Sequence, residues 1–80
     1  MTVAFSNEPE HKLHALVAFN GRHPSIAMPT RYIEACRMWR DALSEEHKLT
    51  ADAALRVFHT GAYATALEAV ALLPPAPYFP

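Results

Sequence analysis

The chain has 80 residues, of which 51% are hydrophobic and 19% charged, and its net charge at pH 7 is −1. This is the length of one domain, and the composition is that of a folded chain, because disordered chains have fewer aromatic residues and more net charge. The balanced charge lacks the basic excess typical of nucleic-acid-binding proteins. We therefore expect a single globular domain spanning residues 1–80.

The cysteine content and the distribution of apolar residues indicate the cellular compartment. There is one cysteine, Cys36, so no disulfide can form within the chain. The first residues show no basic segment followed by an apolar run, as a signal peptide would, and no run of 18 apolar residues could span a membrane. We expect a complete short gene product located in the cytoplasm.

Residues 1–6 are either a short strand at residues 2–5 or an arm whose Phe5 docks on the core, and we expect the arm because no partner strand is obvious. A helix is predicted for residues 8–19. Asn7 suits the N-cap position, with Glu10 three residues later as in a capping box. Gly21 suits the left-handed residue that ends a helix. The helical period places Ala18 on the outer side with His11 and His14, and it gives an inward face of Leu13, Leu16, Val17 and Asn20.

A second helix is predicted for residues 31–43, with Thr30 as its N-cap and an extension to His47 as the alternative. Charged side chains dominate its outer face, Met38 lies in the middle of that face, and Arg40 lies at its border. The inward face consists of Tyr32, Ile33, Cys36, Trp39 and Leu43, and the outer face of Arg31, Glu34, Arg37 and Asp41. Residues 44–48 form a charged connection in which Ser44 is a further candidate cap.

Two more helices are predicted at residues 51–59, after Thr50 as N-cap, and at residues 62–73. The spacing Gly61-x-Tyr63-x-x-Ala66-Leu67 resembles the turn and second helix of a tetratricopeptide repeat. In that family the glycine makes the turn and the small alanine lets the helices approach closely, so the resemblance implies an antiparallel helical hairpin. The last helix is apolar almost all round, which is typical of a helix central to the core or covered by a partner.

Residues 74–80 form a tail with four prolines, for which we expect polyproline II. Its aromatic residues, Tyr78 and Phe79, are expected to dock on this domain, with another molecule as the alternative. The predicted fold class is therefore all-α: a small three- to four-helix bundle with a C-terminal hairpin and a proline-rich tail.

The residues that could carry chemistry do not form a catalytic or metal-binding set. His11 and His14 lie three apart on a helix, but a structural zinc site takes four nitrogen or sulfur ligands, and Cys36 belongs to an apolar face. Glu45 and Glu46 lie on an exposed connection with no pocket to shift a pKa. With two glycines in the chain, there is no phosphate-binding loop. We expect no enzyme, no cofactor and no metal.

We expect a small non-enzymatic protein that binds another protein as a stoichiometric inhibitor or regulator, by analogy with proteins carried by phages or plasmids. Methionine and aromatic residues are enriched in such interfaces. The first alternative is a nucleic-acid-binding regulator using Arg22, Arg31, Arg37 and Arg40, and the second is a homodimeric adaptor with its last helix buried between copies. The predicted partner-binding residues are Arg31, Glu34, Arg37, Met38, Arg40 and Asp41 on one surface, and Leu72, Tyr78 and Phe79 on another.

Overall fold

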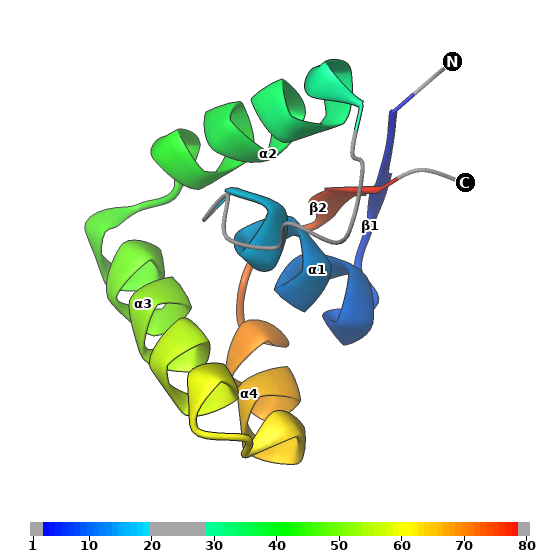
Figure 1. Ribbon diagram of the computed structural model, residues 1–80. Coiled ribbons are helices and arrows are strands. Elements are labelled where there is room, and N and C mark those ends of the chain that lie inside the picture. The colour runs from blue at the N-terminus through cyan, green and yellow to red at the C-terminus, as the bar shows by residue number, and fades with distance from the viewer. Residues whose placement is uncertain (1–2, 20–28, 79–80) are drawn as a thin grey trace.

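The computed structural model describes residues 3–19 and 29–78, which form helices and a small two-stranded sheet (Figure 1). In chain order the elements are β1 (Ala4–Ser6), α1 (Pro9–Phe19), α2 (Thr30–Ala42), α3 (Glu45–His59), α4 (Tyr63–Val70) and β2 (Ala76–Tyr78). The prediction of a mainly helical protein is confirmed, and the sheet is an addition to it. Within the described part of the chain, no helix is long and apolar enough to cross a membrane.

Helix α1 lies at the centre and contacts α2, α3, α4 and β2 (Figure 1). Its buried residues surround most of the helix and are Lys12, Leu13, Ala15, Leu16 and Ala18. Ala18 was predicted on the outer side, and that prediction is wrong because the helix is covered from several directions. The predicted inward residue Asn20 and the terminating Gly21 lie outside the described residues, as does Arg22.

The first turn of α1 begins later than the cap pattern predicts. The Glu8 carbonyl accepts the first helical hydrogen bonds, from the N–H groups of His11 and Lys12. The residue whose carbonyl accepts the first bond occupies the N-cap position, so Glu8 and not Asn7 is the cap. Ser6 Oγ supports the turn by accepting a bond from the Glu8 N–H at 3.1 Å.

Helix α2 buries the face that its periodicity predicts, with Tyr32, Cys36 and Trp39 in the core. Its start differs from the prediction, because the carbonyl of Pro29 accepts the first helical bonds and Thr30 is already helical. The helix ends at Ala42, since Leu43 is extended with ψ of 148°. The predicted alternative of an extension to His47 is therefore wrong.

Helix α3 begins six residues before the predicted start. Ser44 is its N-cap and accepts a hydrogen bond from the His47 N–H at 3.1 Å, which confirms the candidate cap at Ser44. Thr50 lies inside the helix, where its hydroxyl donates to the Glu46 carbonyl, so its prediction as the cap is wrong. Glu45 and Glu46 occupy the first turn, where negative charge is favourable next to the positive end of the helix dipole.

Helices α3 and α4 pack against each other across a tight turn at Gly61 (Figure 1). The φ angle of Gly61 is +90°, a conformation that favours glycine over residues with a side chain. Helix α4 ends at Val70, so it is shorter than predicted. It faces the core with Ala66 and Val70 and packs against α1 and α3, whereas Tyr63 is 50% exposed.

The two ends of the described chain meet in an antiparallel sheet, which overturns two predictions. Residues 1–6 were expected as an arm with Phe5 docked, but they contain strand β1, as the alternative predicted; β1 pairs with β2, and Phe5 is 64% exposed. The tail was expected as polyproline II, but residues 76–78 form a strand with Phe5 opposite Pro77. This segment does fold back onto the domain as expected, because β2 contacts both α1 and α2.

Candidate protein-binding surface

The outer face of α2 is a continuous exposed strip of charged side chains around a methionine. Met38 is 73% exposed, although it is a large apolar residue. The residues of this strip, called the α2 strip from here on, are Arg31, Glu34, Arg37, Met38 and Asp41, and all are exposed. Two are basic and two acidic, so the strip carries no net formal charge.

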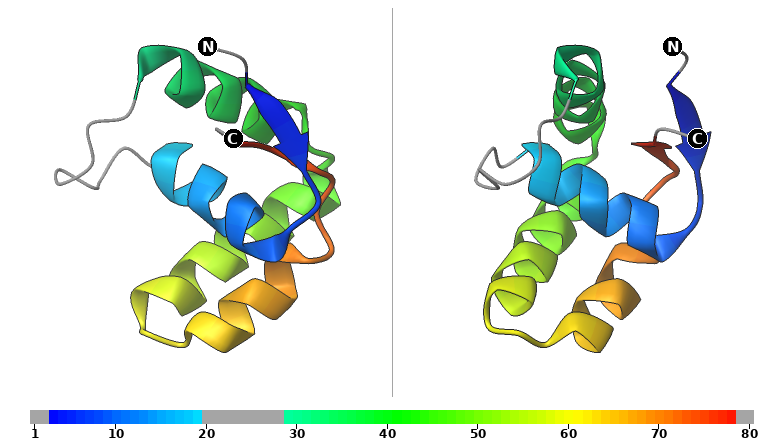
Figure 2. Two further views of the ribbon diagram at one scale, coloured as in Figure 1. Left: turned by 90° about the vertical axis from the view of Figure 1, so that its right-hand side faces the viewer. Right: turned by 45° about the vertical axis from the view of Figure 1, so that its right-hand side comes forward.

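The fold presents this strip because the opposite side of α2 is fixed in the core. At 100° per residue, the buried side chains of Tyr32, Cys36 and Trp39 point away from the strip. Helix α2 packs through them onto α1 and β2, and its other side faces outward (Figure 2). The core residues thus set the orientation of the exposed ones.

Arg40 has a different environment from the α2 strip. Its Nη2 donates to Asp52 Oδ1 at 2.9 Å, and its side chain is only 14% exposed. The guanidinium carbon lies 5.7 Å from the centre of the Phe19 ring, within the range of a cation–π interaction. Arg40 therefore joins the end of α1 to α2 and α3, and much of its charge is used inside the molecule.

The second predicted surface is divided between two segments. Leu72 is 72% exposed in the turn that follows α4. Tyr78 belongs to β2, where its ring stacks on His11 with centroids 4.5 Å apart and planes inclined by 7°. Phe79 lies outside the described residues. The Tyr78 ring is thus part of the packing between α1 and the sheet.

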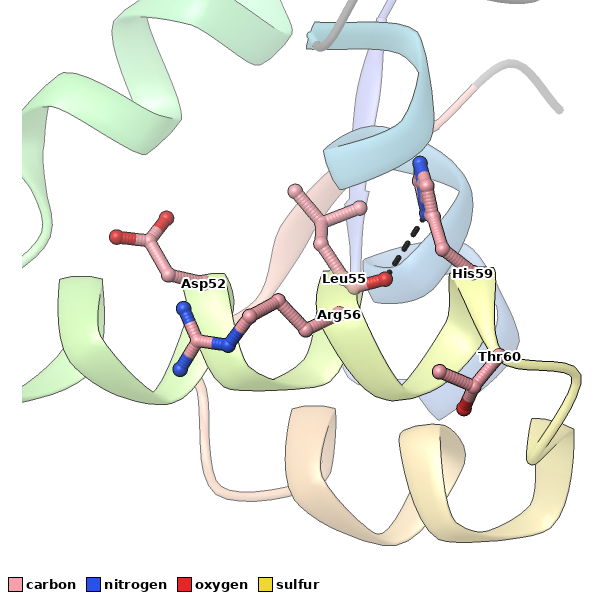
Figure 3. Close-up of a pocket in the computed structure, with 5 residues that line it drawn as sticks. All are labelled: Asp52, Leu55, Arg56, His59 and Thr60. Atoms are coloured by element: carbon pink, nitrogen blue, oxygen red, sulfur yellow. Dashed lines mark hydrogen bonds between the residues drawn. The ribbon is translucent and has the colours of Figure 1, made fainter.

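A wide-open depression on α3 is lined by Asp52, Leu55, Arg56, His59 and Thr60 (Figure 3). Leu55 and His59 point to one side of the helix, and Arg56 extends back along it toward Asp52 (Figure 3). His59 Nδ1 is 3.0 Å from the Leu55 carbonyl oxygen, which holds the ring against its own helix. The helical spacing of Asp52, Arg56 and His59 predicts that they form one polar face, but periodicity alone does not indicate the depression beside them.

The two histidines of α1 are held by different neighbours. His11 Nδ1 lies 2.6 Å from Ser6 Oγ, whereas His14 Nδ1 lies 3.0 Å from the Tyr32 hydroxyl oxygen. Among the described residues, no group of three or more histidine, cysteine, aspartate or glutamate side chains could hold a metal ion.

The single cysteine is buried, as its position on the inward face predicts. Cys36 has no exposed surface, and burial raises the pKa of its thiol. Burial also raises the pKa of the neighbouring Tyr32 hydroxyl, which is hydrogen-bonded to the thiol. A nucleophilic cysteine needs a lowered pKa and access to its substrate, so Cys36 is a packing residue.

No protein-family model, curated protein sequence or solved structure matches the chain. The tetratricopeptide-like spacing therefore remains a local resemblance of the α3–α4 hairpin. The chemistry of the α2 strip is the basis on which a function can be proposed.

Proposed function

We propose that this is a small non-enzymatic protein that acts by binding another protein through the α2 strip. The observation that supports the proposal best is the exposure of Met38, at 73%, in the middle of a charged helix face. A flexible, polarizable side chain surrounded by charged groups resembles the apolar centre and polar rim of a protein interface.

The composition of the strip indicates the chemistry of the partner. An apolar recess would receive Met38, and carboxylates beside it would pair with Arg31 and Arg37. Basic groups would in turn meet Glu34 and Asp41. Because the strip has both signs of charge, the charges would fix orientation and the buried methionine would contribute most of the affinity. A stoichiometric inhibitor or regulator of a larger protein needs no more than such a surface.

Binding of nucleic acid is the alternative, and it has less support. Two acidic residues, Glu34 and Asp41, lie among the arginines of the strip and would repel phosphate. Arg40 is paired with Asp52 and largely buried, so it contributes little outward charge. A homodimer that buries α4 also has less support, because the side of α4 that carries Ala66 and Val70 already packs against α1 and α3.

The test is a comparison of two exposed apolar residues, Met38 and Leu72, which have nearly equal exposure, 73% and 72%. The wild-type protein, Met38→Asp and Leu72→Asp are used as baits in extracts of the native host, and bound proteins are quantified by mass spectrometry. We expect one partner whose recovery falls at least about tenfold with Met38→Asp, the effect of losing a central interface residue. Leu72→Asp should retain that partner.

Two results would reject the α2 strip as the binding surface. One is wild-type recovery no greater than background, and the other is a partner lost with Leu72→Asp but retained with Met38→Asp. Binding to duplex DNA at low salt that disappears with Arg37→Glu would instead support the nucleic-acid alternative.

A further inference from the structure

Within the described part of the chain, the outer side of β1 is an open edge of the sheet. Strand β2 lies between β1 and the helices, and it contacts α1 and α2 (Figure 2). Among the described elements, β1 makes extensive contacts only with β2. Its outer edge is thus directed away from the rest of the described molecule.

The position of Pro77 determines which backbone groups point to that edge. Phe5 lies opposite Pro77 in the antiparallel register. Proline has no N–H, so this pair cannot be one that exchanges two backbone hydrogen bonds. The exchanging pairs are therefore Ala4 with Tyr78 and Ser6 with Ala76. Because bonding alternates along a strand, the N–H and C=O of Phe5 point outward, away from β2.

Apart from the short length of β1, three residues, the edge lacks the features that usually prevent strands from pairing. Charged residues, proline and bulges protect most natural edge strands. Residues 3–7, VAFSN, contain no charge and no proline, and the Phe5 side chain is 64% exposed beside the outward backbone groups. An uncharged edge does not repel an identical edge, and the chain as a whole has a net charge of only −1.

We propose that β1 pairs with β1 of a second copy of this chain, forming a continuous four-stranded antiparallel sheet across a two-fold axis. With the axis at Phe5, its outward N–H and C=O would meet those of Phe5 in the second copy, and the two rings would lie side by side. Such aromatic cross-strand pairs stabilise antiparallel sheets. The pairing leaves α2 out of the contact, so it does not depend on the proposed function of the α2 strip.

Sedimentation equilibrium over low to high micromolar concentration tests the proposal with three variants. Phe5→Pro removes an N–H that makes no bond to β2, and Phe5→Lys places a charge at the edge. Leu72→Lys is the control, since it makes the same change at an exposed residue outside the sheet. We expect both Phe5 variants to dimerise at least about tenfold more weakly than wild type. Phe5→Pro loses two symmetry-related inter-strand hydrogen bonds, whereas Phe5→Lys places two like charges opposite each other and removes the aromatic pair. Leu72→Lys should dimerise like the wild type.

Amide hydrogen exchange of the wild type separates lost pairing from lost folding. The Phe5 amide should become protected as concentration rises, whereas the Ser6 amide, paired with β2, should be protected at every concentration. A wild type that stays monomeric throughout would overturn the proposal. The proposal would also be overturned if both Phe5 variants dimerised like the wild type, or if Leu72→Lys abolished the dimer.

Discussion

At the scale of single residues, Lys12 is the least expected feature of the core. It lies on the central helix α1 with only 1% of its surface exposed. Its Nζ donates a hydrogen bond of 3.2 Å to the carbonyl of Ala71, just after the end of α4. That carbonyl belongs to the negative end of the helix dipole, which favours the ammonium group. Burial opposes this effect and lowers the pKa of Lys12 below its usual value of 10.5.

The lowered pKa predicts how stability depends on pH. Below the folded-state pKa, Lys12 is charged in both states and the full cost of burying the charge is present. Between that pKa and 10.5 the unfolded chain binds more protons, so stability rises with pH; above 10.5 the cost is absent. Lys12→Met should therefore stabilise the protein at neutral pH, by about 1 kcal/mol, because an apolar residue of similar shape replaces a buried charge.

Chemical denaturation of wild type and Lys12→Met at a series of pH values measures this effect. The advantage of the variant should shrink as the pH approaches 10.5. If Lys12→Met is instead less stable at neutral pH, the hydrogen bond to Ala71 outweighs the burial of the charge.

At the scale of elements, the start of α3 separates two cap candidates that look alike in the sequence. Ser44 accepts the His47 N–H at the end of the helix, whereas Thr50 donates to a carbonyl inside it. Replacing an N-cap serine with alanine costs about 1 kcal/mol, so Ser44→Ala should lower the free energy of unfolding by that amount. Thr50→Ala should be neutral or slightly stabilising, since alanine has the higher helix propensity.

Thermal unfolding of the two variants beside wild type makes the comparison. A larger loss of stability for Thr50→Ala than for Ser44→Ala would mean that α3 begins at the later residue in solution. Similar losses would also contradict the boundary described for α3.

The helices show what the sequence could and could not predict. The inward face of α2 was predictable because Tyr32, Cys36 and Trp39 recur at helical spacing. The boundaries were less predictable, since Ser44 and Thr50 each precede a sequence able to form a helix. The α2 strip could also be predicted from the sequence, because it lies on the side of the helix opposite the buried face, and the same helical spacing defines both.

Two features of the proposed surfaces depend on contacts that helical periodicity does not describe. Arg40 and Asp52 lie 12 residues apart and on different helices, so their pairing requires the packing of α2 relative to α3. The pairing of β1 with β2 joins residues 70 or more positions apart. The sequence indicated a short strand at residues 2–5 as an alternative, but not its partner, because residues 76–78 are centred on a proline and do not show the pattern of a strand.

At the scale of the whole molecule, β2 joins segments that are distant in the chain. It pairs with β1, contacts α1 and α2, and places Tyr78 against His11. Ala76 and Pro77 are buried in the strand, so its removal would expose the core as well as the sheet. A chain of this length has a total stability of roughly 4–12 kcal/mol, so the loss of one buried segment affects a large part of it.

A variant that stops after Pro75 tests this role of β2. Its free energy of unfolding should fall by roughly 2–4 kcal/mol, from the lost burial of Ala76, Pro77 and part of Tyr78. Tyr78→Ala is the matched partial change, and it should lose about 1–2 kcal/mol through the missing stack on His11. Denaturation with urea, followed by far-UV circular dichroism, measures both. If the shortened chain unfolds at the same urea concentration as the full chain, β2 is an attached strand and not part of the cooperative core.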